Sequence, residues 1–286
     1  MIAIVESGTT KTSWYFFDKS DKTFEYKTIG MNPYYQNPDD IQNNLSDSLI
    51  PNLAFTEKVD IIYFYGAGCE LQPQRDVIKK GLKSVFPNTD IIVNHDLLAA
   101  ARALFANKPG IACIAGTGSN SCLYDGKEVI WNVHSLGLFM GDEGSGGYKG
   151  KLLIADYIRR AMPELIRNRF EAKYTDRTKD MMDAVYLKPF PSRYLASFMP
   201  FIIENVAHPY LYDLVYKSFE AQFDNTICKY ENFQKFEVGF VGSIAFYLKD
   251  ILLDVAKKKH VNITKIIQAP LMELVAYHKQ NGLVNV

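Results

Sequence analysis

Short apolar runs alternate with helical patterns along the first hundred residues. Apolar or β-prone runs at Ile2–Glu6, Ser13–Asp18 and Thr23–Ile29 predict three consecutive strands. Asn37 and Pro38 then supply an N-cap and a first helical residue, so a helix is expected to begin there. The pattern continues with a strand at Val59–Tyr65, a helix at Pro73–Phe86, a strand at Asp90–Val93 and a helix at Leu97–Phe105. The predicted order β-β-β-α-β-α-β-α is typical of an α/β domain.

The same alternation begins again near residue 110. A strand at Gly110–Ala115 is followed by a hairpin of Ser121–Tyr124 and Glu128–Val133, and Asp125-Gly126 between them indicates a type I′ turn. Residues from about 147 to 233 are mainly helical in pattern, and after them strands and helices alternate once more. These later elements are a strand at Phe236–Val241, a helix at Ser243–Lys258, a strand at Thr264–Gln268 and a last helix from about Pro270.

These patterns predict two α/β domains, formed by residues 1–107 and 108–286. The second carries a helical insertion at about 147–233, and its last helix could pack back on the first domain. An internal similarity indicates a duplication, because Ile4–Trp14 superposes on Ile114–Tyr124 without a gap and both have the pattern strand, Gly/Ser/Thr turn, strand. Two such turns would offer backbone N–H and hydroxyl donors to a phosphate chain.

Composition removes several classes of function. The 286-residue chain has 32 basic and 32 acidic side chains, so no net field attracts nucleic acid or an anionic membrane. Its four cysteines have the spacing of neither a disulfide framework nor a zinc site. The segment from Met1 to Glu6 lacks the features of a signal peptide, and no apolar run reaches the length of a membrane span. We therefore expect a cytoplasmic protein that binds neither nucleic acid nor membranes.

Two glycine-containing turns are candidate phosphate sites. In the segment Glu6–Thr12, Gly8 allows a tight turn, and the hydroxyls and amides that follow can donate to phosphate oxygens. Glu6 at the strand end could hold a hydrated Mg²⁺, although an ordinary polar hairpin turn is the alternative interpretation. In the segment Ala115–Asn120, two glycines in three residues allow close approach of an anion. This second segment is neither a Walker A loop nor a GxGxxG sequence that opens a helix.

Three further segments carry candidate chemistry. Asp96 stands where a strand turns into a helix, a common position for catalytic groups in open α/β sheets, but taken by itself the residue is better interpreted as a plain N-cap. His95 beside it is expected to be structural. The adjacent acids Asp142 and Glu143 lie among glycines, which favours a loop that accepts hydrogen bonds from ligand hydroxyls. The passage from strand to helix at Gly239–Ser243 could admit an adenine ring, or serve close strand–helix packing.

The order and spacing of these segments resemble the sugar kinase/Hsp70/actin (ASKHA) superfamily. Within it, the chain resembles the N-acetylglucosamine kinase group of the BadF/BadG/BcrA/BcrD ATPase family. The resemblance implies two ribonuclease-H-like (actin-like ATPase) domains with an interdomain cleft that closes over ATP, Mg²⁺ and an amino sugar. It also implies a homodimer. The motifs that carry it are Ser7-Gly-Thr-Thr-Lys-Thr12, Asn94-His-Asp96, Gly116-Thr-Gly-Ser-Asn120 and Gly141-Asp-Glu-Gly-Ser145.

The resemblance further implies roles for individual residues. Asp96 matches the catalytic base, which takes the proton from the sugar hydroxyl. Glu6 stands where the family usually has aspartate, and its extra methylene shifts the carboxylate by roughly 1 Å or more, which is expected to alter the Mg²⁺ geometry. The positions that match sugar-binding residues are Asn32, Asn120 and Asp142, with Glu143 beside them. The residues expected to contact ATP are Ser7, Gly8, Thr9, Thr10, Lys11, Thr12, Gly116, Thr117, Gly118, Ser119, Gly242 and Ser243.

The implied activity is ATP-dependent phosphorylation of N-acetylglucosamine at its 6-hydroxyl. Glucosamine, N-acetylmannosamine and N-acetylmuramate stay open as substrates. One alternative is the activator ATPase of a 2-hydroxyacyl-CoA/benzoyl-CoA-type reductase or dehydratase, which needs cysteines for an iron–sulfur cluster. Cys113 and Cys122 are expected in buried strands instead, which disfavours it. Another alternative is a catalytically weak sugar or nucleotide sensor, for which Glu6 is the only indication.

Overall fold

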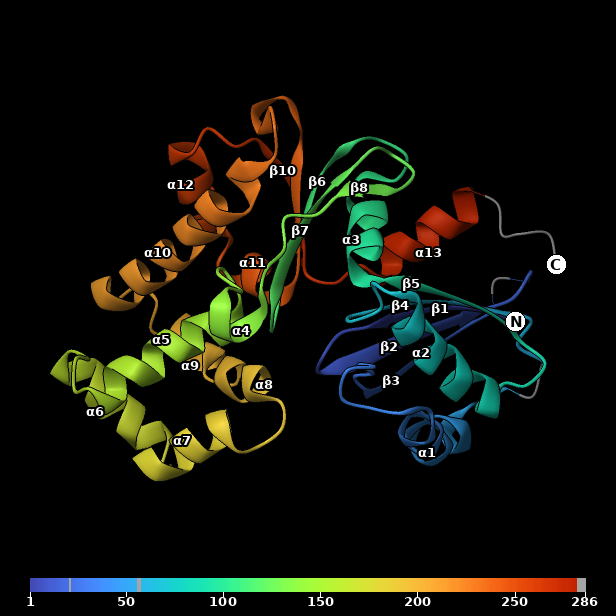
Figure 1. The fold of residues 1–286 in the computed structure, drawn as a ribbon, viewed down its shortest axis with the longest axis horizontal. Coiled ribbons are helices and arrows are strands. Elements are labelled where there is room, and N and C mark those ends of the chain that lie inside the picture. Colours follow the sequence, from blue (N-terminus) through green and yellow to red (C-terminus); the bar gives the residue numbers. More distant parts are fainter. Residues whose placement is uncertain (21, 56–57, 282–286) are drawn as a thin grey trace. The chain divides into compact units, whose positions relative to one another are not determined.

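The computed structural model describes residues 1–20, 22–55 and 58–281 (Figure 1). Close contacts divide the chain into two units, one formed by Met1–Asn107 with the chain from Ala269 onward, the other by Lys108–Gln268. Each unit holds one five-stranded sheet with helices packed on it. Within the described ranges, no helix is long and apolar enough to cross a membrane.

The sheet of the first unit has the strand order β3-β2-β1-β4-β5. Its first three strands form an antiparallel meander, whereas β4 and β5 run parallel to β1. β4 is buried along its whole length, as its continuous apolar sequence predicts. The elements of this unit are β1 (Ile2–Ser7), β2 (Lys11–Phe17), β3 (Thr23–Ile29), α1 (Pro38–Ser48), η1 (Ile50–Asn52), β4 (Ile61–Gly66), α2 (Gln72–Val85), β5 (Asp90–His95), α3 (Asp96–Phe105) and α13 (Leu271–Gln280).

Helix α1 begins where the sequence predicts. The Asn37 side-chain oxygen accepts hydrogen bonds from the backbone N–H groups of Asp39 and Asp40, at 2.9 and 3.0 Å. The Asp40 carboxylate in turn accepts from the Asn37 N–H at 2.9 Å. This reciprocal pair satisfies N–H groups that the first helical turn would otherwise leave unpaired. The predicted N-cap is confirmed.

The sheet of the second unit has the strand order β8-β7-β6-β9-β10. Its central strand β6 pairs antiparallel with β7 and parallel with β9, and β10 continues the parallel side. Strand by strand, β6–β10 therefore repeat the topology of β1–β5, which confirms the duplication that the sequence indicated. These elements are β6 (Gly110–Ala115), β7 (Ser119–Tyr124), β8 (Val129–Trp131), β9 (Val238–Val241), α11 (Ser243–Tyr247), α12 (Lys249–Lys258) and β10 (Ile263–Ile267).

The two repeats differ in the turn of their first hairpin. Ser7 is the last residue of β1 to pair and its partner is Thr12, whereas in the second repeat Ala115 pairs with Ser119. The first turn is therefore one residue longer than the second. The superposition without a gap is therefore wrong here, because the difference in residue number between the two repeats changes by one from the first strand of the hairpin to the second.

Two local predictions are also wrong. A type I′ turn needs positive φ at both central residues, but of the pair Asp125-Gly126 only Gly126 has it, at 102°. The Asp125 side chain instead accepts hydrogen bonds from the N–H groups of Lys127 and Glu128, both at 2.7 Å, which produces a wider loop. The single helix expected at Ser243–Lys258 is interrupted at Leu248, whose φ of −111° and ψ of 25° separate α11 from α12.

The helical insertion lies between β8 and β9 and supplies much of the second unit's core. Phe170 is fully buried, and the rings of Tyr157, Phe198 and Phe201 lie 4.7–5.7 Å from its own. The elements of the insertion are α4 (Gly137–Met140), α5 (Gly146–Ile158), α6 (Glu164–Lys173), α7 (Thr178–Tyr186), α8 (Pro191–Ala196), α9 (Met199–Glu204), α10 (Pro209–Asn225), η2 (Ile227–Lys229) and η3 (Phe233–Lys235).

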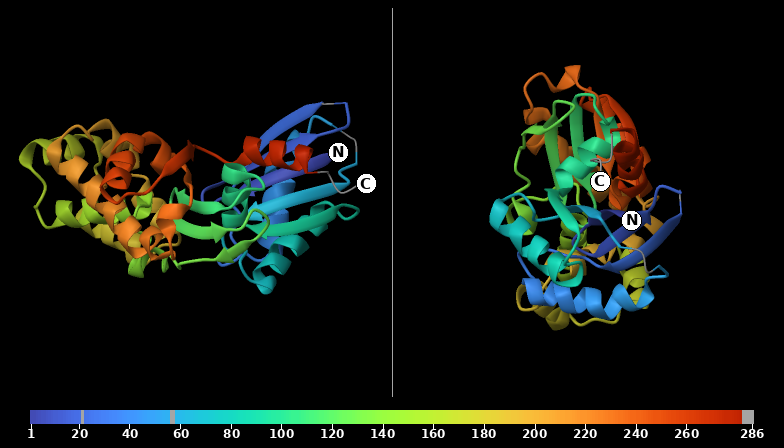
Figure 2. Two further views of the ribbon diagram at one scale, coloured as in Figure 1. Left: turned by 90° about the horizontal axis from the view of Figure 1, so that it is seen from above. Right: turned by 90° about the vertical axis from the view of Figure 1, so that its right-hand side faces the viewer.

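Helix α13, red in Figures 1 and 2, packs against α3 and β1 of the first unit. His278 of α13 is buried, and its Nε2 lies 2.8 Å from the Tyr65 hydroxyl on β4. Arg102 of α3 donates a hydrogen bond to the same Tyr65 oxygen at 2.6 Å. The Tyr65 hydroxyl proton is then available to the imidazole, which accepts it only in its neutral form.

Acid is therefore expected to weaken the attachment of α13. Burial, aided by the Arg102 charge, lowers the pKa of His278 from 6.5 to about 4. The unfolded chain takes up this proton at a higher pH than the native state, so the stabilisation is complete above pH 6.5 and is lost as the pH falls toward 4. His278→Gln should reduce that loss by on the order of 2 kcal/mol. Urea unfolding at pH values from 7 to 4 measures the free energy of unfolding of each variant. His134→Gln is the control, because His134 is exposed. The prediction would be contradicted if the free energy of unfolding fell by the same amount between pH 7 and pH 4 in the wild type and in His278→Gln.

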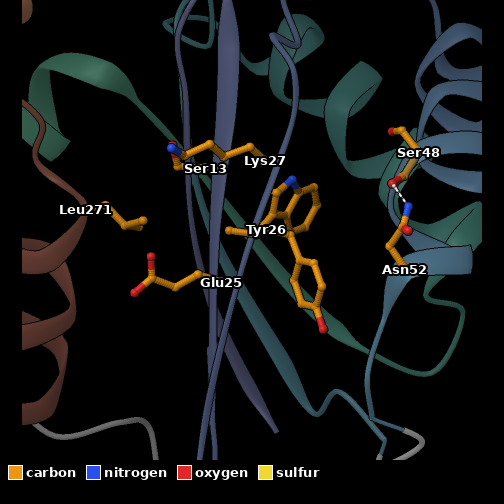
Figure 3. A pocket seen from close by; sticks show the side chains of 8 residues that line it. Ser13, Glu25, Tyr26, Lys27, Ser48, Asn52 and Leu271 are labelled. Carbon is orange, nitrogen blue, oxygen red and sulfur yellow. Dashed lines mark hydrogen bonds between the residues drawn. The ribbon is translucent and has the colours of Figure 1, made fainter.

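A hollow of about 410 Å³ lies at the edge strand β3 of the first unit, and none of its lining residues is a predicted site residue. Glu25 and Lys27 point to one side of the strand and Tyr26 to the other (Figure 3). Residues of both faces therefore line it. Its lining residues are Ser13, Trp14, Glu25, Tyr26, Lys27, Ser48, Asn52 and Leu271.

Candidate active site

The turn between β1 and β2 separates its hydroxyls into two groups. Ser7 and Thr12 are fully buried, their hydroxyl oxygens lie 2.7 Å apart, and Ser7 also accepts from the Met31 N–H at 2.9 Å. These two hydroxyls thus stabilise the turn on its buried side. Thr9 is half-buried, whereas Thr10 and Lys11 are exposed, so Thr9–Lys11 is the part of the turn that faces outward. Gly8 closes the turn through its N–H, which donates to the Lys11 carbonyl at 3.0 Å.

The segment that follows β3 lies against this turn. The Gly30 N–H donates to the Thr10 carbonyl at 3.1 Å, and a Cβ at Gly30 would run into the backbone of the turn. Two residues on, Asn32 is 9% exposed, and its side-chain oxygen accepts from the Tyr34 N–H at 3.0 Å. A Cβ at Gly68 would come within 2.9 Å of that oxygen. The fold therefore places Asn32 next to both the first turn and the loop after β4.

Asp96 is the first residue of α3, at the carboxyl end of β5. The N-cap is His95, whose Nδ1 accepts from the Leu98 N–H at 3.3 Å, so the interpretation of Asp96 as the N-cap is wrong. Burial and the nearby arginines Arg75 and Arg102 lower the pKa of His95 to about 4, which keeps its ring a neutral acceptor. The structural role expected of His95 is thereby confirmed, and the Asp96 carboxylate receives backbone hydrogen bonds from Leu97 and from its own N–H, which partly oppose the rise of its pKa.

At this end of the sheet, the charge of Asp96 acts on Glu6 and the charge of Glu70 acts on Asp96. Burial raises the pKa of Asp96 from 3.8 to about 7, and the negative charge of Glu70 raises it further. Burial likewise raises the pKa of Glu6 from 4.5 to about 7, with Lys11 opposing and Asp96 adding to the shift. Glu6 is the last residue but one of β1, Glu70 follows β4 and Asp96 follows β5, so all three come from the carboxyl ends of parallel strands. Sequence reasoning missed Glu70, although its place just after a buried parallel strand was a usable signal.

In the second unit, hydrogen bonds join the turn after β6 to the glycine-rich loop before α5 and to the first residues of α5. The Gly146 and Gly147 N–H groups donate to the carbonyls of Gly116 and Thr117, at 2.8 and 3.0 Å. From the other side, the Ser119 hydroxyl donates to the Glu143 carbonyl at 2.8 Å. Two motifs that are about 25 residues apart in sequence are thus bonded to each other in the fold.

Asp142 is the most constrained acid of this loop. Its φ is 60°, its exposure is 8%, and its N–H donates to the Ser135 carbonyl at 2.8 Å. Its side-chain oxygen accepts from the Ser119 N–H at 3.3 Å. Burial raises its pKa to about 6, while the hydrogen bonds from Ser119 and Ser135 oppose the shift. Left-handed φ is uncommon outside glycine, although aspartate tolerates it better than most residues, so the backbone of Asp142 is specified by its loop.

The other two predicted sugar contacts are already bonded within the second unit. Glu143 accepts a hydrogen bond from the Asn225 side chain of α10 at 2.8 Å, so its carboxylate is directed toward that helix. The Asn120 side-chain oxygen accepts from the Ser121 N–H and from Asn132, both at 2.9 Å. Among the residues that the structure describes, the Asn120 amide nitrogen has no partner, and it is the group left to bind a ligand.

Gly242 brings the β9–α11 connection against the same turn. Its φ is 130°, and a Cβ there would collide with the Ala115 backbone and lie 3.1 Å from the Gly116 nitrogen. Ser243, which follows, is exposed at the start of α11. By contrast, a Cβ at Gly116 would meet nothing within 4 Å, so open space lies beside the turn. Gly242 therefore serves close packing, and Gly116 leaves room for a ligand.

Two sheets of one repeated topology, each with polar turns at the carboxyl ends of its parallel strands, define the class of actin-like ATPases and sugar kinases. A search of family models finds no match to the chain, and a search of curated proteins finds none either. The crystal structure of a protein provisionally named an N-acetylglucosamine kinase, from Porphyromonas gingivalis, superposes with a TM-score of 0.92. It shares 38% identity, and the match covers 99% of this chain and 100% of that one. The chain therefore belongs to the N-acetylglucosamine kinase group.

More distant structures share the fold alone. A protein provisionally named an N-acetylglucosamine kinase from Chromobacterium violaceum has 15% identity and a TM-score of 0.73, with 96% of this chain and 98% of that chain covered. MreB 5 of Spiroplasma citri bound to AMPPNP has 9% identity and a TM-score of 0.59, with 99% and 98% covered. The actin-like fold class predicted from the sequence is confirmed.

Proposed function

We propose that the protein transfers a phosphoryl group from ATP to the 6-hydroxyl of an amino sugar, with N-acetylglucosamine as the first candidate. The observation that carries this proposal is the 38% identity to the Porphyromonas gingivalis protein over 99% of the chain. The carboxylate arrangement at Glu6, Glu70 and Asp96 supports it from the chemical side. A homodimer and a cytoplasmic location belong to the same proposal.

Asp96 would act as the general base. With a pKa of about 7, an appreciable fraction of the carboxylate is ionised at neutral pH and is still basic enough to accept a proton. It would orient the sugar hydroxyl and take its proton as the phosphoryl group is transferred. Phosphoryl transfer depends mainly on positioning and charge stabilisation, so this alignment is the main contribution of Asp96.

The residues present fit ATP and Mg²⁺. Within the described residues there is no cluster of three or more His, Cys, Asp or Glu side chains arranged for a metal. A cation beside Glu6 would be held by that carboxylate together with water and phosphate oxygens, which are ligands that Mg²⁺ prefers. When bound, Mg²⁺ neutralises charge on the β- and γ-phosphates. We infer that Thr9–Lys11 and Gly116–Gly118 lie along the phosphates, and that Gly242 and Ser243 lie beside the adenosine.

Asn32, Asn120 and Asp142 are the proposed sugar contacts. Asn120 has a free amide nitrogen to donate, and Asp142 can accept from a sugar hydroxyl. Glu143 would contribute only after leaving Asn225, so we assign it the smaller part. Sugar identity is expected to depend on these few contacts.

The activator ATPase is disfavoured by the positions of the thiols. Cys69, Cys113 and Cys122 are buried, and Cys228 is half-buried. Burial raises the pKa of Cys69 to about 12, which disfavours the thiolate needed to bind iron. A cluster ligand needs an accessible thiolate, and these cysteines do not supply a set of them.

An ADP-release assay tests the proposed function. Purified protein with MgATP is given N-acetylglucosamine, glucosamine, N-acetylmannosamine, N-acetylmuramate, glucose or no sugar. We expect release that depends on sugar and is greatest with N-acetylglucosamine. Equal release with and without every sugar would indicate the activator ATPase instead. ATP binding without release would favour the sensor and direct attention to Glu6.

A further inference from the structure

A lysine is buried directly behind the glycine-rich loop of the second unit. Lys149 of α5 is 0% exposed, and its Nζ donates a hydrogen bond to the Gly144 carbonyl at 2.6 Å. The same Nζ lies 3.8 Å from the centre of the Phe219 ring on α10. No acidic side chain pairs with it among the described residues. Lysine is almost never fully buried without such a partner, so its retention here requires a reason.

Helix α10 completes a polar socket around Gly144. The Gly144 N–H donates to the Ser218 hydroxyl at 3.2 Å, so Lys149 and Ser218 hold the carbonyl and the N–H of one residue from two helices. Gln222 is 1% exposed and lies so close that a Cβ at Gly144 would run into its side chain. Neither polar atom of the Gln222 amide has a partner. A buried amide without partners is costly and is uncommon in a region that serves packing alone.

Two residues of the loop that the socket contacts have left-handed backbone conformations. Asp142 and Gly144 both have positive φ, at 60° and 84°. Left-handed φ is uncommon for a residue with a Cβ, although aspartate adopts it more readily than most, so contacts around the loop help to select this conformation of Asp142. The Gly144 carbonyl, which Lys149 binds, is two residues from the Asp142 carboxylate.

We propose that Lys149 is a positioning residue for the sugar. Its amine fixes the Gly144 peptide and thereby holds Asp142 in the conformation that accepts a sugar hydroxyl. Ser218 does the same through the Gly144 N–H. This inference rests on the proposed function for the identity of the ligand, whereas the contacts between the socket and the loop are independent of it.

The test compares three variants in the full-length protein. Lys149→Met keeps most of the side chain's volume and its contact with Phe219 but removes the amine, leaving the Gly144 carbonyl unpaired. Ser218→Ala removes the second contact from the other helix. Lys217→Met is the matched control. Lys217 precedes Ser218 in α10, and its side chain is 69% exposed.

We expect Lys149→Met and Ser218→Ala each to raise KM for N-acetylglucosamine about tenfold, while KM for ATP stays within about twofold of the wild type. Lys217→Met should change neither constant. A melting temperature that falls without a change in sugar KM would mean that Lys149 serves stability alone, and would overturn the proposal.

Hydrogen exchange of the amides in residues 141–147, without any ligand, gives a readout that does not depend on activity. Lys149→Met is expected to accelerate their exchange at least about tenfold, with the amides of β6 unchanged. If the wild type phosphorylates no sugar, the proposed function fails, and the exchange rates alone decide whether Lys149 holds the loop. Exchange at the wild-type rate in Lys149→Met would refute the inference whatever the enzyme's substrate.

Discussion

Replacing Asp96 by asparagine is expected to lower the rate of sugar phosphorylation by a factor of about 10²–10⁴. The amide has nearly the shape of the carboxylate but cannot take a proton from the sugar hydroxyl. The N-cap of α3 is His95, so the substitution leaves the start of the helix intact. Removing one of the carboxylates that repel one another should also leave ATP binding close to that of the wild type.

Single-turnover phosphorylation and ATP titration of the same preparation measure the two effects separately. Asp90→Asn is the matched control, since Asp90 is exposed at the opposite end of β5 and should retain full activity. Unchanged turnover in Asp96→Asn would remove Asp96 from the mechanism. A loss of ATP binding equal to the loss of turnover would mean that Asp96 organises the nucleotide site rather than the sugar hydroxyl.

Gly242→Ala is expected to lower the free energy of unfolding by at least about 3 kcal/mol. At φ 130° and ψ 153° the backbone is in a region open almost only to glycine. The new Cβ would also collide with the backbone of Ala115, which cannot rotate away as a side chain could. The collision displaces the turn after β6, so the fraction that folds should bind ATP poorly.

Gly116→Ala provides the contrast within the same turn. A Cβ there meets nothing within 4 Å, and Gly116 is not among the residues with positive φ, so thermal melting should match the wild type. If phosphate oxygens pass beside Gly116, the methyl group should still raise KM for ATP about tenfold, equivalent to about 1.4 kcal/mol of binding energy. Melting of Gly242→Ala at the wild-type temperature would show that the turn can move and would contradict the structural argument.

The sequence predicted the elements well where a pattern is local. The strand at Thr23–Ile29 and the strand at Gly110–Ala115 have the predicted bounds, and Asn37 caps α1 through its own neighbours. Each of these features depends on residues within a few positions of one another. The turn at Asp125-Gly126 failed for a local reason as well, since the Asp125 side chain offers a competing set of hydrogen bonds.

For the candidate site, the sequence identified the motifs but not the role of each side chain in them. The motifs around Gly8, Gly116 and Asp142 were recognisable because glycines and polar residues occur where strands end. Which side chain faces a ligand was not recognisable. Ser7 and Thr12 looked like phosphate donors, but their hydroxyls bond to each other inside the turn, through a strand pairing that no single segment reveals.

The sequence by itself determined the α/β pattern, the repeated strand order and the residue types of a phosphate- and sugar-binding protein, because periodicity and turn chemistry act over short distances. Only the tertiary structure decided how these residues are used. It joined the Gly116 carbonyl to the Gly146 amide and brought the charge of Glu70 close enough to act on Asp96. It also placed Lys149, without a counter-ion among the described residues, in contact with the Gly144 carbonyl. Such effects depend on burial and on charges from distant segments, and these arise when strands and helices far apart in the chain pack together.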